Sequence, residues 1–260
     1  MRHVHRSHAT ATLASLATLA FLSAPVHANY YTNGTWSTSP DEGNREIYGD
    51  AVEDYSGTGS SNLNQCVNGL EDFIYWMEFI NYTRWQYSTD EDAWSWDFED
   101  GELDETYGDA GDFAYFSGHG STGYAKFNGD YGDNLYDTET LLGNNDLEFM
   151  AFDSCQTVNA AGRTDFIAAN EGLGLHFVFG FQSTALDIST TARNYGIYNM
   201  VGYTVRNAWV TATMDGHSSS KTGAYVRFYE AGCDTLNETA TSFACDPEGV
   251  VSTVEFTWTL

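Results

Sequence analysis

Three short, uninterrupted apolar runs constrain the fold of this chain most strongly. They cover residues 113–116, 149–152 and 173–181, and the last reads Leu-Gly-Leu-His-Phe-Val-Phe-Gly-Phe. A half-exposed strand alternates apolar and polar residues, whereas a strand buried on both faces is apolar throughout, as in a parallel sheet. The three runs therefore predict buried strands of a mostly parallel sheet.

Segments before, between and after these runs have the spacing of helices. Residues 63–80 place apolar side chains three and four positions apart, which is typical of an amphipathic helix. Residues 163–170 are compatible with a second helix, and residues 190–214 with a longer one that Ser189 or Thr190 can cap. Runs that alternate with helices predict an α/β fold, a three-layer sandwich around a mostly parallel sheet.

The remaining segments have weaker patterns. Residues 224–229 and 250–260 alternate apolar and polar, which predicts half-exposed strands added at an edge or on one face. Residues 29–59 are rich in Gly, Ser, Thr, Asn and Tyr and predict irregular structure or short edge strands. Because no repeat or linker interrupts the chain, we expect a single domain over residues 29–260, with its core at about residues 60–215.

The first 28 residues have the features of a secretory signal peptide. Arg2 and Arg6 make a basic start, residues 13–22 are apolar, and cleavage is predicted between Ala28 and Asn29. The apolar stretch is too short to span a bilayer, and no later segment approaches the ~20 apolar residues of a membrane helix. We therefore expect a secreted protein without a membrane span.

The charge balance is strongly acidic. The chain has 37 Asp and Glu against 10 Lys and Arg, a net charge of −27 at pH 7, and its lysines are Lys126 and Lys221. Nucleic acid is excluded as a partner class because phosphate binding needs a basic surface. An acidic, lysine-poor surface suits high salt, where counterions screen its self-repulsion, and this favours a halophilic source.

Calcium binding is the alternative explanation of this acidity. Residues 97–104 and 130–134 are dense in oxygen ligands around a glycine, although neither has the spacing of an EF-hand. Solvated acidic loops have the same composition, and we favour that interpretation. Nothing in the sequence requires a cofactor, and calcium is the one candidate ligand.

The four cysteines differ in their surroundings. An even number of cysteines suggests disulfides in an exported protein. Cys233 and Cys245 flank a short polar segment and are candidates to close a small loop. Cys66 lies within the amphipathic pattern of residues 63–80 and is expected to be buried, which leaves Cys155 to be explained.

His119 and Cys155 each stand just beyond an apolar run. Reactive groups collect at the carboxyl ends of the strands in an open parallel sheet, so neighbouring strands would bring imidazole and thiol together across one crevice. The thiolate is the nucleophile, and an imidazole can take the thiol proton and return it to a leaving amine. The structural alternatives are a buried or disulfide-bonded Cys155 and a His119 that only caps a turn.

The residues beside this pair extend the same hypothesis. Gly118 and Gly120 allow the backbone to approach a substrate closely, and the amides of Gly120 and Cys155 are candidate donors of an oxyanion hole. Asp153 shares a face with Cys155. Its negative charge would raise the pKa of the thiol, so Asp153 better suits the floor of a pocket for a cationic side chain; capping the following helix is the alternative.

These motifs resemble those of the caspase-like cysteine peptidases, the group that includes metacaspases, gingipains, clostripain and legumain. Tyr-Phe-Ser-Gly-His-Gly at residues 115–120 and Asp-Ser-Cys at residues 153–155 are similar to the catalytic motifs of metacaspases. The resemblance implies a caspase-like αβα fold with extra edge strands. It implies His119 as base, Cys155 as nucleophile and Gly120 as an oxyanion-hole donor.

The resemblance also bears on substrate binding. It implies that Asp153 forms the floor of a pocket for Arg or Lys and that residues 179–185, with Gln182 and Ser183, form the next strand and a substrate-lining loop. After the cysteine, Gln-Thr-Val stands where metacaspases usually have His-Ser-Gly. Residues 112–209 also resemble a secreted family described only as a domain of unknown function with this caspase-like pattern.

The sequence therefore predicts a secreted cysteine endopeptidase that acts on peptides or proteins through Cys155 and His119. Cleavage after Arg or Lys is the finer inference, and transpeptidation would use the same acyl-enzyme. The alternative is a non-catalytic binding or surface protein on the same scaffold, because an aromatic content of 15% would suit carbohydrate or cell-wall contact. A calcium-dependent adhesin is a third hypothesis.

Overall fold

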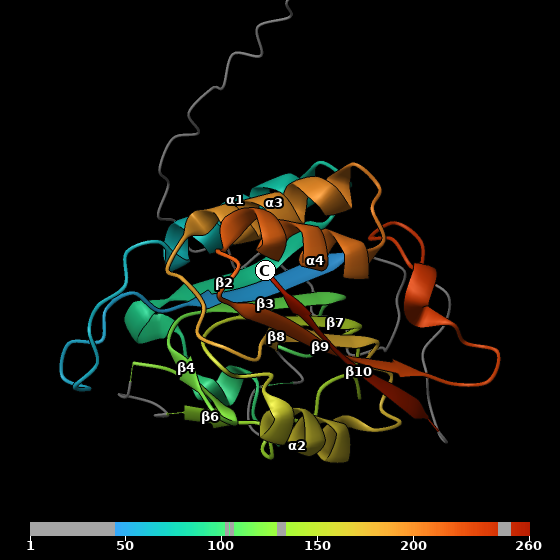
Figure 1. Cartoon of the computed structure of the whole chain (residues 1–260), viewed down its shortest axis with the longest axis horizontal. Helices are drawn as coiled ribbons and strands as arrows, with labels where there is room; N and C mark the ends of the chain where they lie inside the picture. Colours follow the sequence, from blue (N-terminus) through green and yellow to red (C-terminus); the bar gives the residue numbers. More distant parts are fainter. Residues whose placement is uncertain (1–44, 102–103, 105–106, 129–133, 244–250) are drawn as a thin grey trace, which may run out of the picture.

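A seven-stranded, mostly parallel sheet forms the centre of the protein (Figure 1). The computed structural model describes residues 45–101, 104, 107–128, 134–243 and 251–260, so the predicted signal peptide lies outside the described residues. In spatial order the strands are β10 (Ser252–Thr259), β9 (Thr222–Tyr229), β8 (Phe177–Phe181), β7 (Phe149–Asp153), β3 (Phe113–Ser117), β1 (Glu46–Ala51) and β2 (Thr83–Thr89). Neighbours from β8 to β2 are parallel, and β9 and β10 are antiparallel additions at one edge.

Helices cover both faces of this sheet. One face carries three helices packed together: α1 (Cys66–Glu78), α3 (Ser189–Met200) and α4 (Val205–Gly216) (Figure 1). The other face carries α2 (Ala160–Asn170) and a small antiparallel sheet of β4 (Gly120–Ser121), β5 (Tyr124–Lys126) and β6 (Asn134–Tyr136). Single 3-10 turns occur at Asp90–Asp92, Ser95–Asp97 and Thr235–Asn237.

This arrangement confirms the predicted fold class at a coarse level: the protein is a mixed α/β fold around a large, mostly parallel sheet. The three apolar runs form β3, β7 and β8, which are adjacent and fully buried. Among the described residues, no helix has the length and apolar character needed to cross a membrane.

The predicted long helix over residues 190–214 is wrong. The chain forms two helices, α3 and α4, separated by a turn in which Gly202 has a positive φ of 87°. Glycine adopts this left-handed conformation without the steric cost that a Cβ would bring. Thr204 then caps α4 by accepting a hydrogen bond from the Asn207 amide.

The sheet also extends beyond the predicted core of residues 60–215. β1 falls in the segment predicted to be irregular or to form short edge strands, yet it is an internal strand between β2 and β3 and is almost wholly buried. β9 was predicted to be half exposed, but six of its eight residues are buried because α4 and α2 flank it on opposite faces. The described part of the connection from β3 to β7 contains the small sheet and no α-helix.

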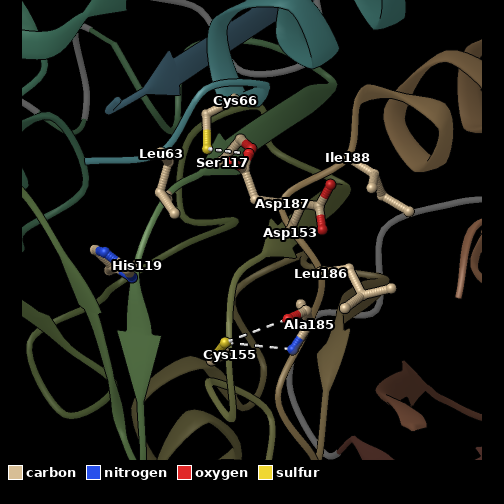
Figure 2. A pocket seen from close by; sticks show the side chains of 11 residues that line it. Leu63, Cys66, Ser117, His119, Asp153, Cys155, Ala185, Leu186, Asp187 and Ile188 are labelled. Carbon is tan, nitrogen blue, oxygen red and sulfur yellow. Dashed lines mark hydrogen bonds between the residues drawn. The ribbon is translucent and has the colours of Figure 1, made fainter. Parts of the chain in front are cut away.

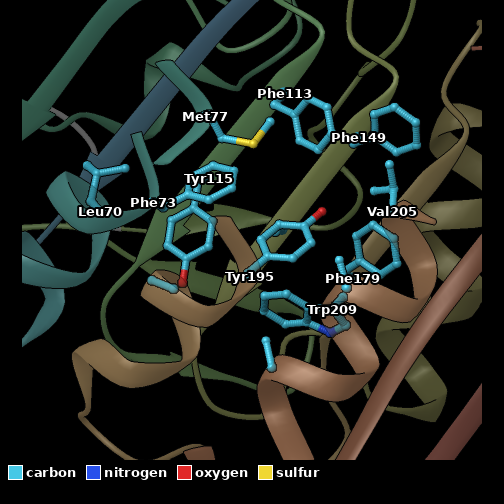
Figure 3. Packing of buried hydrophobic residues seen from close by; sticks show 14 of the residues in the cluster. Leu70, Phe73, Met77, Phe113, Tyr115, Phe149, Phe179, Tyr195, Val205 and Trp209 are labelled. Atoms are coloured by element: carbon cyan, nitrogen blue, oxygen red, sulfur yellow. The ribbon is translucent and has the colours of Figure 1, made fainter. Parts of the chain in front are cut away.

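Two hydrophobic cores explain why the central strands are apolar throughout. Tyr115 points toward the core under α1, α3 and α4, whereas Phe116, the next residue, points toward the core under α2. In the first core Phe113 and Phe149 stack at 4.6 Å, and Phe73 stacks on Tyr195 at 5.1 Å (Figure 3). Burial of such a ring contributes about 1.5–3 kcal/mol, so both faces of each strand are held in place.

Several carboxyl groups are buried as well. The Tyr48 hydroxyl lies 2.6 Å from Asp50 Oδ1 and 2.9 Å from Asp97 Oδ2. Burial raises the pKa of Asp50 well above its usual range and the pKa of Asp97 to about 6. Burial likewise raises the pKa of Asp112 to about 8. Because each protonated acid avoids placing a negative charge in the interior, these groups favour the folded state at low pH.

We expect the free energy of unfolding to fall as the pH rises from about 6.5 to 8. A carboxyl group whose pKa is raised by folding stabilises the folded state fully at pH values below its pKa in the unfolded chain, which is ~4. This stability is lost as the pH rises through the pKa in the folded state, which is about 8 for Asp112. Buried His217 acts oppositely at lower pH because burial lowers its pKa to about 4, so the window starts at ~6.5.

Urea denaturation of the protein in a chelating buffer at several pH values measures this dependence. Asp112→Asn, which keeps an oxygen acceptor but does not titrate, should flatten it. Stability that rises between pH 6.5 and 8 would contradict the assignment.

Candidate active site

The register of β3 and β7 brings the two motifs together. Ser117 at the end of β3 is the direct partner of Asp153 at the end of β7. His119 and Cys155 each lie two residues further along, and adjacent strands are about 4.8 Å apart. The Gly118 amide also donates to the Asp153 carbonyl at 3.4 Å, which holds the two chain segments together beyond the last paired residues.

Gly120 packs directly against the cysteine motif. A Cβ at this position would lie 2.7 Å from the Cys155 carbonyl oxygen and 3.0 Å from the Ser154 side chain, so only glycine fits. His119 O accepts from Lys126 N at 2.9 Å, which makes residues 119 and 126 a hydrogen-bonded pair. Pairs alternate in an antiparallel ladder, so Gly120 belongs to a non-hydrogen-bonded pair and its amide points away from β5.

The His119 ring is fixed by the segment that precedes α1. The ring packs against Tyr55 with centroids 4.5 Å apart, and the Tyr55 hydroxyl accepts from the His119 amide at 2.8 Å. Nε2 lies 2.7 Å from the Ser61 carbonyl oxygen. A carbonyl only accepts, so Nε2 carries the proton in this contact and the neutral ring keeps its lone pair on Nδ1.

Cys155 is a free, partly buried thiol. The Ala185 amide donates to its sulfur at 3.3 Å, and the thiol donates to the Ala185 carbonyl at 3.7 Å. Burial raises the pKa of Cys155, whereas the Ala185 hydrogen bond and the charge of Lys221 lower it and Asp153 raises it further. Ala185 therefore offers an acceptor to the thiol and a donor to the thiolate.

His119 and Cys155 line one cavity of about 150 Å³ (Figure 2). The other lining residues come from the segment before α1, from the ends of β3 and β7, and from the loop after β8; they are Leu63, Cys66, Ser117, Gly118, Asp153, Ala185, Leu186, Asp187 and Ile188. The cavity thus combines two thiols, an imidazole and two carboxyl groups at the carboxyl end of parallel strands, where ligands of open α/β sheets bind.

The two carboxylates of the cavity differ in their partners. Asp187 accepts from the backbone amides of Asn64 and Gln65 at 2.7 and 3.0 Å, so it ties the loop after β8 to the start of α1. Asp153 is only 7% exposed, and one of its oxygens accepts from the Tyr115 hydroxyl at 3.0 Å. The other oxygen, Oδ1, has no hydrogen-bond partner within the described part of the chain.

A buried oxygen without a hydrogen bond, such as Asp153 Oδ1, destabilises the folded protein when no ligand is bound. Burial raises the pKa of Asp153 to about 7, the Tyr115 hydrogen bond lowers it, and nearby Asp187 raises it. A buried carboxyl with an unused oxygen in a cavity is suited to a donor group of a ligand.

Gln182 and Ser183 lie beside the cavity and not in its wall. The Gln182 side chain is exposed and accepts from Arg163 at 3.1 Å. Ser183 Oγ accepts from the Thr222 amide at 2.8 Å, and the Ser183 carbonyl accepts from the Gln156 amide at 2.9 Å. These two residues therefore brace the loop after β8, and the wall itself is formed by residues 185–188.

Several residues of this site carry no local sequence signal. Tyr55, Ser61 and Asp187 reach it from distant segments. His217 is only 8% exposed; its Nδ1 accepts from the Leu186 amide at 3.3 Å and its Nε2 lies 3.0 Å from Thr191 Oγ1. It therefore supports the cavity wall from behind.

The remaining cysteine and calcium predictions have mixed outcomes. Cys66 is buried with a free thiol, as expected. Cys233 is disulfide-bonded, but Cys245, its predicted partner, lies outside the described residues. The predicted ligand stretch at residues 130–134 also falls almost wholly outside them.

Within the described ranges, one group of three carboxylates has the spacing to hold a cation. Oxygens of Glu46, Asp112 and Asp146 lie within 4.8 Å of one another at the amino ends of β1 and β3. This group lies at the opposite end of β3 from His119. None of its three residues belongs to the stretches 97–104 and 130–134 that the sequence analysis considered for calcium.

A family described as "Domain of unknown function (DUF6345)" matches residues 50–259, which is most of the chain. The match includes β3, β7 and every residue that lines the cavity. No curated protein matches the sequence.

We expect iodoacetamide to alkylate Cys155 much faster than Cys66 in the native protein. Cys155 is partly exposed on the cavity, whereas Cys66 is 4% exposed and burial raises its pKa above that of an ordinary thiol. Peptide mapping after timed alkylation measures both rates, and urea-unfolded protein, in which the two rates should be similar, is the control. Equal native rates would contradict the assignment of Cys155 as the accessible thiol.

Proposed function

We propose that this chain, which belongs to the DUF6345 family, is a secreted cysteine peptidase with a caspase-like fold. Three features support the proposal. The strand β3 is followed by His119 and its neighbour β7 is followed by Cys155, both residues line one cavity, and the first 28 residues have a signal-peptide pattern. The observation that carries it is the β3–β7 register, because the pairing of Ser117 with Asp153 starts the segments of His119 and Cys155 from neighbouring strand ends, and both residues line one cavity.

In the first half of the reaction, Nδ1 of His119 takes the proton of the Cys155 thiol. The sulfur attacks the carbonyl carbon of a peptide, and the carbon–oxygen π electrons move onto oxygen. The Gly120 and Cys155 amides are the proposed donors to this oxyanion. The tetrahedral intermediate then collapses to a thioester, and the leaving amine takes the proton from the His119 imidazolium.

In the second half, water attacks the thioester carbonyl and gives its proton to His119. The carbon–sulfur bond breaks, the carboxylic acid leaves, and the sulfur recovers the proton. The Ser61 carbonyl accepts Nε2–H throughout, so the lone pair on Nδ1 remains available as the base and the imidazolium is stabilised by a fixed dipole.

The cavity supports a preference for a cationic side chain before the cleaved bond. Asp153 lines the same cavity as His119 and Cys155, and its buried Oδ1 has no hydrogen-bond partner among the described residues. Both Asp187 oxygens, by contrast, already accept hydrogen bonds from backbone amides. An ammonium or guanidinium group would satisfy Asp153 Oδ1 and remove the cost of the buried charge. Leu63 and Ile188 would cover the aliphatic part of such a side chain.

Covalent capture tests the reaction itself. A peptide acyloxymethyl ketone ending in Arg should modify Cys155 of the secreted form, and mass spectrometry should locate the adduct there. Cys155→Ala should abolish modification and His119→Ala should slow it by about 100-fold or more, because the thiolate then forms without its base. A folded protein with accessible Cys155 that never reacts would favour the non-catalytic binding protein instead.

The preference should depend on pH through Asp153. The ratio of kcat/KM for Arg over Asn peptides should rise as the pH increases through about 7, because the ionised carboxylate binds a cation and the protonated acid does not. Taking a ratio cancels the titration of the dyad.

Asp153→Asn should reduce this ratio by about 100-fold and remove its pH dependence. A ratio that is flat in the wild type, or unchanged in the variant, would remove Asp153 from substrate recognition while leaving the dyad in place.

A further inference from the structure

The two lysines of this acidic chain both lie at the rim of the candidate site. Lys126 on β5 donates to Ser60 Oγ at 2.8 Å and so holds the segment that carries the Ser61 carbonyl. Lys221, directly before β9, donates to Thr184 Oγ1 at 2.5 Å on the opposite side of the cavity. The acidic surface does not depend on these two lysines, so we consider what each one contacts.

Lys221 is fixed by its backbone before its side chain reaches the site. Its carbonyl accepts from the Leu260 amide at 3.0 Å, and its amide donates to the Ser218 carbonyl at 3.1 Å. The next residue, Thr222, accepts from the Gln182 and Ser183 amides. The start of β9 is therefore a rigid base for the loop after β8.

The contact with Thr184 leads directly to the sulfur. Thr184 precedes Ala185, whose amide and carbonyl are the two hydrogen-bond partners of Cys155 Sγ. Ser183, on the other side of Thr184, binds the amide of Gln156, the residue after the cysteine. Residues 183–185 thus connect the Lys221 ammonium, which binds Thr184, with the Cys155 sulfur and with the amide of the residue after it.

The other charged groups around Cys155 do not replace this ammonium. Asp153 on β7 disfavours the thiolate, and Asp187 adds negative charge to the same cavity. His217 at the end of α4 is neutral near pH 7 because burial and Lys221 lower its pKa to about 4. His119 supplies a cation only after it has taken a proton, so Lys221 is the permanent positive charge that acts on this thiol.

We propose that Lys221 is a positioning residue for Cys155: its ammonium group, anchored on Thr184, holds residues 183–185 against the sulfur and favours the thiolate. The inference deepens the proposed function, on which it rests for the role of Cys155 as nucleophile. It assigns the electrostatic activation of the thiol to a residue outside both catalytic motifs. Burial raises the pKa of Cys155, and the charge of Lys221 opposes this rise, which agrees with the geometry.

The test is the pH profile of Cys155 alkylation by iodoacetamide in the secreted form, followed by peptide mapping. Lys221→Met should slow alkylation about three- to tenfold at pH 7, because the fraction of thiolate falls when the nearby cation is lost. The rates should converge at high pH, once the thiol is ionised in both proteins. Lys221→Arg, which keeps the charge, should stay within about twofold of the wild type.

Arg206→Met is the matched control, because it also removes one positive charge but lies in the first turn of α4, at the opposite end of that helix from His217. It should leave the profile unchanged. A Lys221→Met profile that superimposes on the wild type, or that is displaced equally at every pH, would overturn the inference. Failure of the wild type to react with the peptide ketone would instead contradict the proposed peptidase, since the alkylation profile does not depend on peptide cleavage.

Discussion

The candidate site depends on the parallel register of β3 and β7. Neither motif contains both reactive groups, and the pairing of Ser117 with Asp153 is what converts their separate positions into one crevice. That register is held by side chains on both faces of the sheet: a one-residue slip would send Tyr115 and Phe116 into the wrong cores. The aromatic packing on the two faces of the sheet thus fixes the relative positions of the segments that carry His119 and Cys155.

A second constraint is the placement of carboxyl groups in the interior of an acidic protein. Asp50, Asp97 and Asp112 are buried within the fold, whereas Asp153 is buried against a cavity. The first two share the Tyr48 hydroxyl, and Asp112 accepts a backbone amide. Among the described residues Asp153 Oδ1 has no hydrogen-bond partner, and Asp153 lines the candidate site, so a ligand bound there can relieve the cost of this buried oxygen.

The sequence predicted the central part of the fold because burial on both faces leaves a simple signature. Continuous apolar runs identified β3, β7 and β8, and the two motifs at their ends indicated which residues meet. The same reasoning did not predict β1 as an internal strand, because its Gly and Asp residues resemble a loop. The Tyr48 hydroxyl that contacts Asp50 also contacts Asp97, and such a long-range contact leaves no local pattern. It also joined α3 to α4, since helical spacing continues across Gly202.

The loop after β8 is anchored by groups from four separate elements. Asp187 reaches the start of α1, Leu186 contacts His217 beyond α4, Thr184 binds Lys221, and Ser183 binds Gln156. All of these contacts form within one intact chain, so folding alone gives this wall its shape. A peptide that enters the cavity does not have to order the loop, and the conformational entropy of four residues is absent from the free energy of its binding.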